Sequence, residues 1–112
     1  MSEDMRDGIQ TTLECYDICT EGVAYCADRG GQHIEPAHLK ALLDCAEICK
    51  AAAGFILRAS DLHTTVCDAC AAACEHCATS CDQLSDDNFM PQCAEVCRRC
   101  AQACRRMAGV QA

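Results

Sequence analysis

The 112-residue chain contains no tryptophan, and its aromatic side chains other than histidine are two tyrosines and two phenylalanines. It therefore lacks the exposed aromatic surface on which nucleic-acid bases stack. Basic residues are also scarce, nine against seventeen acidic ones, and the net charge of −8 disfavours binding to nucleic acids and to anionic membranes. The longest apolar run, residues 51–57, is much shorter than the roughly 20 residues that cross a bilayer.

The usual core-forming residues are few as well: seven Leu, five Ile, four Val and two Phe. The chain has 19 Ala and 14 Cys instead, so cysteine must form a large part of any core. The first residues are acidic and polar, without the basic and apolar segments of an export signal, and we expect a cytosolic protein. In a reducing cytosol, closely spaced cysteines are more often metal ligands or redox groups than disulfides.

The cysteines fall into four groups, and within each group they are separated by three, four or seven residues. Such steps keep side chains on one face of an α-helix. Between the groups lie Gly, Pro, Ser and Asp residues typical of turns and helix ends, and Ser60 and Asp61 are predicted to cap the third helix. The sequence thus predicts helices over about 4–28, 36–58, 61–84 and 89–108, with a turn at 85–88.

Short connections make successive helices antiparallel neighbours. We therefore expect residues 1–112 to form a single all-α domain, an antiparallel up-down-up-down four-helix bundle with a cysteine-lined core. The sequence shows no pair of carboxylates, Ser/His/Asp set or phosphate-binding loop, so we expect a binding protein rather than an enzyme.

Three roles for such a core can be compared. Cysteine can act as a small buried hydrophobe, but Leu, Ile and Val would pack better. The six C-x3-C pairs cannot form disulfides within a helix, because residues i and i+4 have Cβ atoms about 5–6 Å apart and a disulfide needs about 3.5–4.5 Å. Disulfides between helices remain possible. A linear sulfur–metal–sulfur unit spans roughly 4.5 Å and fits both kinds of pair.

Among thiophilic metals, the pattern favours Cu(I). Cu(I) accepts two or three soft ligands and suits a continuous row of thiolates, whereas zinc prefers four. One Cu(I) per thiolate leaves the core neutral, and on this argument the chain binds about 14 Cu(I). The pairs at 74–77 and 97–100 also fit the spacing of a zinc ribbon, although they lie inside the helical rows. The alternative functions are a thiol redox protein and a disulfide- or zinc-stabilised structural protein.

The repeated Cys-Ala-Glu-(Ile/Val)-Cys segments at 45–49 and 93–97, on an Ala-rich helical background, resemble the bacterial copper storage proteins. Because no export signal is visible, the chain resembles the cytosolic branch of this family in particular. This resemblance implies a homotetramer of bundles, each filled with Cu(I). It assigns a ligand role to Cys15, Cys19, Cys26, Cys45, Cys49, Cys67, Cys70, Cys74, Cys77, Cys81, Cys93, Cys97, Cys100 and Cys104. The second helix departs from the pattern, since it carries only two cysteines.

Two further residues are candidate ligands at one end of the bundle. His38 precedes Cys45 by seven residues and Met90 precedes Cys93 by three, so both continue the cysteine rows. Imidazole and thioether groups both bind Cu(I). We expect copper to enter at this end, which also holds Cys26, Cys81 and Cys93. The opposite end is predicted to be closed by Met5, Ile9, Phe55, Ile56, Leu62 and Met107, and His76 is predicted to lie on the surface.

Overall fold

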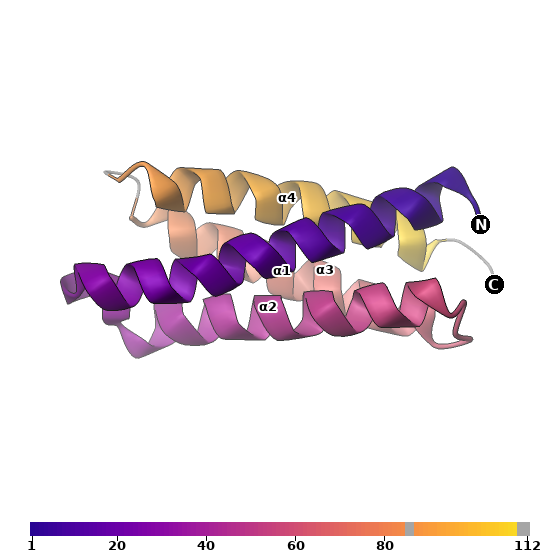
Figure 1. The fold of residues 1–112 in the computed structure, drawn as a ribbon, viewed down its shortest axis with the longest axis horizontal. Coiled ribbons are helices and arrows are strands. Elements are labelled where there is room, and N and C mark those ends of the chain that lie inside the picture. Colours follow the sequence, from indigo (N-terminus) through magenta and orange to yellow (C-terminus); the bar gives the residue numbers. More distant parts are fainter. Residues whose placement is uncertain (85–86, 110–112) are drawn as a thin grey trace.

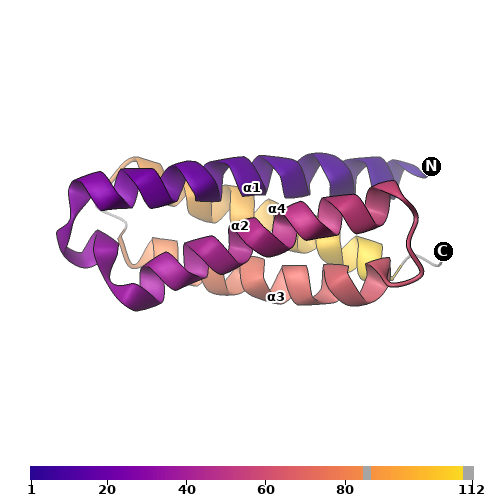
Figure 2. The same ribbon diagram turned by 60° about the horizontal axis from the view of Figure 1, so that its bottom comes forward.

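In the computed structural model, the described residues, 1–84 and 87–109, form four long α-helices and no strand (Figures 1 and 2). Successive helices run in alternating directions, and each packs against two neighbours to give a bundle of 44 × 18 × 17 Å. The all-α, antiparallel four-helix bundle predicted from the cysteine spacing is confirmed. The helices are α1 (Glu3–Arg29), α2 (Pro36–Leu57), α3 (His63–Asp82) and α4 (Phe89–Ala108), with a short 3-10 helix, η1 (Gly31–Ile34), between α1 and α2.

The helix ends follow local chemistry. The Ser2 hydroxyl accepts a hydrogen bond from the Met5 N–H (3.1 Å) at the start of α1. At its end, Gly30 adopts a φ of 69°, a left-handed conformation that glycine takes without strain. Pro36 opens α2 at the position where its missing N–H has no helical partner. The predicted limits of α1 and α2, where these signals lie, fall within one residue of the observed ones, and the predicted limits of α4 agree with the structure as well.

The start of α3 was predicted less well. The hydroxyl of Ser60 accepts a hydrogen bond from the N–H of Leu62 (3.1 Å), within the turn that precedes the helix, and α3 begins at His63 without a side-chain cap. The prediction that Ser60 and Asp61 cap the helix is therefore wrong. Residues 85 and 86 of the predicted turn before α4 lie outside the described residues.

All fourteen cysteines have fully buried side chains, and together with alanines they make up most of the core. The two ends of the bundle differ in the connections and chain termini that lie there (Figures 1 and 2). We call them the α1–α2 end, where α1 leads into α2 and α3 into α4, and the α2–α3 end, where α2 leads into α3 and the chain starts. Among the described helices, none is apolar over a length sufficient to cross a membrane.

Candidate metal centre

The thiols form a closely spaced network along the inside of the bundle. Neighbouring Sγ atoms lie 4.0 Å apart within a helix, as in Cys15–Cys19, and as little as 3.6 Å apart between helices, as in Cys45–Cys74. All fourteen cysteines are free thiols. The C-x3-C pairs are thus not disulfides, in agreement with the helix geometry, and the helices bring thiols of different cysteine groups together.

These separations match those between sulfurs that share a metal ion. With metal–sulfur bonds of about 2.3 Å, three sulfurs around one ion lie about 4.0 Å apart, and two on opposite sides lie about 4.6 Å apart. Contacts of 3.6–4.0 Å therefore need only small side-chain movements to accept an ion bound by two or three thiolates.

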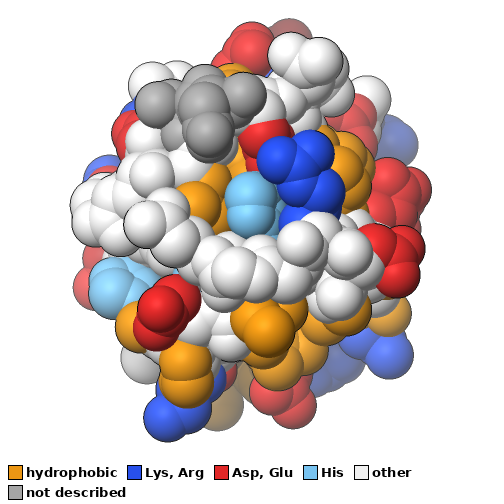
Figure 3. Space-filling view, turned by 90° about the vertical axis from the view of Figure 1, so that its left-hand side faces the viewer, with side chains coloured by type: hydrophobic (Ala, Val, Ile, Leu, Met, Phe, Trp, Pro, Cys, Tyr) orange, Lys and Arg blue, Asp and Glu red, His pale blue; other side chains and the backbone are white. Residues whose placement is uncertain are grey.

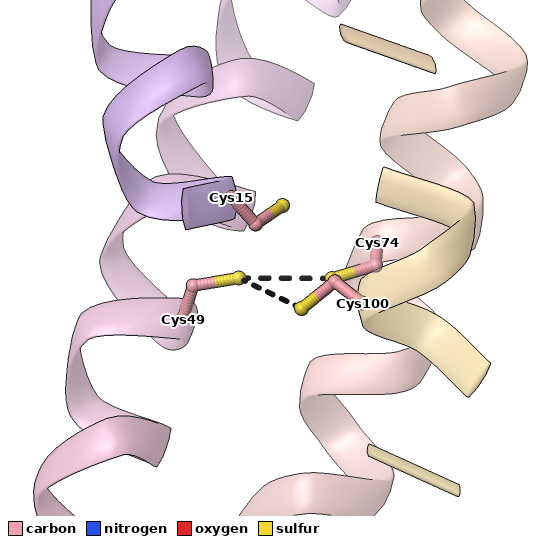
Figure 4. Close-up of side chains that lie close together, drawn as sticks. All are labelled: Cys15, Cys49, Cys74 and Cys100. Carbon is pink, nitrogen blue, oxygen red and sulfur yellow. Dashed lines mark hydrogen bonds between the residues drawn. The ribbon is translucent and has the colours of Figure 1, made fainter. Parts of the chain in front are cut away.

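Within the described part of the chain, the closest groups of three or four thiols have common members. Figure 4 shows one group, in which Cys49 of α2 faces Cys74 and Cys100, at 3.6 and 3.8 Å, and Cys15 lies beside them. The groups are Cys15/Cys49/Cys74/Cys100, Cys15/Cys19/Cys45/Cys97, Cys19/Cys77/Cys93/Cys97 and Cys70/Cys100/Cys104.

Four of these cysteines, Cys15, Cys19, Cys97 and Cys100, each belong to two groups. Separate four-thiolate sites of the kind zinc prefers therefore cannot all form at once. Thiolates that bridge two ions resolve this conflict, and Cu(I), which needs only two or three of them, suits such a network.

Burial of all fourteen thiols favours their neutral form before metal arrives. Burial raises the pKa of Cys26 to about 11. Hydrogen bonds with Cys77 and Cys93, together with burial, raise the pKa of Cys81, and similar bonds with Cys100 and Cys67 raise that of Cys104. None of the described lysines or arginines is buried, so no side-chain cation balances thiolate charge in the core. An incoming cation must therefore displace protons.

The structure brings Cys26, His38 and Met90 together at the α1–α2 end. The Cys26 sulfur lies 3.4 Å from His38 Nε2 and 4.0 Å from Met90 Sδ. His38 Nδ1 lies 2.7 Å from the Ser80 hydroxyl, which fixes the ring. Burial is the main cause that lowers the pKa of His38, and the nearby His33 lowers it further, which favours the neutral imidazole.

His38 also faces outward. It lines a surface pocket of about 410 Å³, formed with residues of η1, α2 and the end of α3: Gln32, Glu35, Ala37, Ser80, Gln83 and Leu84. The imidazole thus stands between this pocket and the Cys26 thiol, which is the position expected for a ligand that passes an ion inward.

The same end contains a buried pair that the sequence did not indicate. His33 Nε2 lies 2.6 Å from a carboxylate oxygen of Asp87, and the other oxygen accepts hydrogen bonds from the N–H groups of Phe89 and Met90. Burial opposes ionisation of Asp87, but the bonds from Met90 and His33 lower its pKa. Figure 3 views this end, with imidazole, basic and acidic side chains near its centre. The pair joins η1 to the start of α4 and so holds Met90 in place.

The α2–α3 end is only partly as predicted. Ile56 and Met107 are fully buried there, and three of the other expected residues, Met5, Ile9 and Phe55, are partly buried. Leu62, however, is 59% exposed, so its predicted place in the closure is wrong. Because α3 starts at His63, the histidine turns inward in place of the leucine and is 1% exposed. His76, on the same helix, is exposed as predicted.

A four-helix bundle with shared thiol groups along its core is a multi-site binding protein for soft metal ions. The chain matches the family model for copper storage proteins (Csp) over residues 1–109, and it belongs to this family. Comparison with curated proteins finds no match.

Several solved structures share the fold over nearly the whole chain. A protein from Nitrosospira multiformis is 35% identical, with a TM-score of 0.91, and the match covers 97% of this chain and 98% of that one. The Cu(I)-bound copper storage protein BsCsp3 is 28% identical, with a TM-score of 0.88 and coverage of 95% and 99%. Ccsp from Streptomyces lividans, loaded with 10 copper equivalents, is 28% identical, with a TM-score of 0.82 and coverage of 96% and 85%.

Proposed function

We propose that this protein is a cytosolic store for Cu(I), with its fourteen cysteines as ligands and with His38 and Met90 as additional ligands at the α1–α2 end. The observation that carries the proposal is the sharing of thiols between neighbouring groups in a core without buried lysine or arginine among the described residues. Membership of the copper storage family supports it, as does the similarity to a cytosolic copper storage protein from Streptomyces lividans. The role is storage rather than catalysis, and the resemblance to the family supports a homotetramer.

Anaerobic titration of the reduced protein with Cu(I) tests this function. We expect saturation near 14 Cu(I) per chain, because each of the 14 thiolates contributes one negative charge and each Cu(I) one positive charge. X-ray absorption should show sulfur as the dominant ligand. Saturation at one to four equivalents would contradict storage and favour a discrete zinc-like site, whereas loss of free thiols without metal uptake would favour the redox alternative.

Copper is expected to enter at the α1–α2 end, through His38 and then Cys26 and Met90. The variants His38→Ala and Met90→Leu should each slow Cu(I) uptake several-fold, because each removes a donor that binds copper without losing a proton. Met90→Leu keeps the buried volume, so it separates loss of the thioether from loss of packing.

Stopped-flow measurement of uptake provides the test, with His76→Ala as the matched control because His76 is exposed. The final copper capacity of the His38 and Met90 variants should fall by at most about one ion. Unchanged uptake rates in both variants, together with first occupancy near Cys67 in partly loaded crystals, would show that copper enters at the opposite end.

A further inference from the structure

His63 stands out at the α2–α3 end, which is otherwise closed mainly by apolar side chains. It is the first residue of α3 and is 1% exposed. Of the buried side-chain nitrogen and oxygen atoms in the described residues, its Nε2 alone has no hydrogen-bond partner. A buried polar atom without a partner is costly, so an atom left in this state requires an explanation.

The turn before α3 determines which ring nitrogen carries the proton. His63 Nδ1 lies 2.8 Å from the Ser60 carbonyl oxygen, which can only accept a hydrogen bond, so Nδ1 is the donor. In the neutral ring, Nε2 then carries a free lone pair. The backbone N–H of His63 also donates to this carbonyl (3.1 Å), which holds the start of the helix and the ring together. A backbone carbonyl that orients one nitrogen while the other points to a metal is a common arrangement in metal sites.

His63 also continues the row of cysteines. It precedes Cys67 by four residues, the same step that relates Cys70 to Cys74, so both side chains lie on one face of α3. The Cys67 thiol is fully buried. The row of thiols thus extends toward the buried imidazole.

Met107 supplies a third donor at this end. Its side chain is fully buried and passes over Gly8 of α1, where an added Cβ would lie 2.8 Å from its Cγ and 3.4 Å from its Sδ. Glycine at position 8 therefore leaves the space that the thioether occupies. The α2–α3 end then has the same three kinds of donor as the α1–α2 end: one imidazole, one thiol and one thioether.

We propose that His63 Nε2, the Cys67 thiolate and the Met107 thioether form a terminal Cu(I) site that closes the α2–α3 end of the row. The inference rests on the proposed storage function and adds a second end site to it. His63 is not a member of the close thiol groups described above, so binding requires Cys67 to adjust its rotamer toward the imidazole. An end site of this kind keeps the last ion of the row bound by protein donors instead of water.

Nitrogen-15 NMR of the histidine side chains is the direct test, because Cu(I) is diamagnetic. Full loading with Cu(I) should move the His63 Nε2 resonance from its position in copper-free protein to that of a metal-coordinated nitrogen. The exposed His76 should not respond. An unchanged His63 resonance in protein that has bound about 14 Cu(I) would overturn the end site while leaving the storage function intact.

Variants give an independent test by titration with Cu(I) alone. His63→Leu and Met107→Leu should each bind about one Cu(I) fewer than the parent protein. The double variant should lose the same ion and no more. His76→Leu is the matched control on α3. His63→Leu removes a buried atom without a partner, and the Ser60 carbonyl, which loses the bond from the ring, keeps the one from the backbone N–H of residue 63, so the copper-free variant should still fold. Full capacity in both variants would contradict the proposal, whereas saturation of all proteins at one to four equivalents would contradict storage itself.

Discussion

Loading with Cu(I) is expected to raise the temperature of thermal unfolding by tens of degrees. The copper-free core is built from Cys and Ala, which bury little apolar surface each, so the stability of the apo bundle is modest. A ligand that binds only the folded state adds about 4 kcal/mol per site at a thousand times its Kd. Since about 1 kcal/mol moves the unfolding temperature of a domain of this size by roughly 2–8 °C, a few filled sites already give a large shift.

Circular dichroism of reduced protein under anaerobic conditions measures this effect, with and without 14 equivalents of Cu(I). The copper-free protein should already be helical and should unfold cooperatively, because its thiols are neutral and its alanines favour helix. Mg²⁺, which prefers oxygen ligands, is the control and should leave the unfolding curve unchanged. A random-coil spectrum without copper would instead show that metal binding drives folding, as in zinc fingers.

The fold was predictable because the cysteines record helical periodicity directly. Steps of three and four residues define the inward faces of all four helices, and Pro36 and Gly30 mark boundaries that the structure reproduces. The limits of α3 were harder, since Ser60 and Asp61 look like caps but form a turn. Adjacent residues of a helix point about 100° apart, so with His63 on the inward face of α3, Leu62 points away from the core.

The residues of the candidate site could be predicted from the sequence, but which thiols of different helices lie next to each other could not. Which thiols meet between helices depends on how the helices are placed along the bundle axis, and this register has no signature in a single sequence. The contact of 3.6 Å between Cys15 and Cys45 is an example, as is the His33–Asp87 pair, whose members are 54 residues apart. A signal for His63 was present, however, because it continues the four-residue steps of α3 toward Cys67.

Proton release is the second large effect expected of copper loading. Each thiol that becomes a thiolate ligand loses a proton, so filling the core should release about one proton per Cu(I) bound. Burial without a compensating cation keeps the thiols protonated before copper arrives, so this release should be nearly complete at neutral pH. For Cys26, burial raises the pKa to about 11 against an ordinary value of 9.0. The pKa values of Cys81 and Cys104 are raised in the same direction.

The sign of the pH dependence follows from this competition between copper and protons. Below the folded-state pKa of the thiols, each proton released makes the copper affinity rise about tenfold per pH unit. For Cys26 this rise should continue up to about pH 11. Titration in weak buffer with a pH-stat counts the protons, and competition with a Cu(I) chelator between pH 6 and 9 measures the slope. A release far below one proton per copper, with affinity independent of pH, would mean that the core thiols are already ionised, which the burial of all fourteen without a compensating cation argues against.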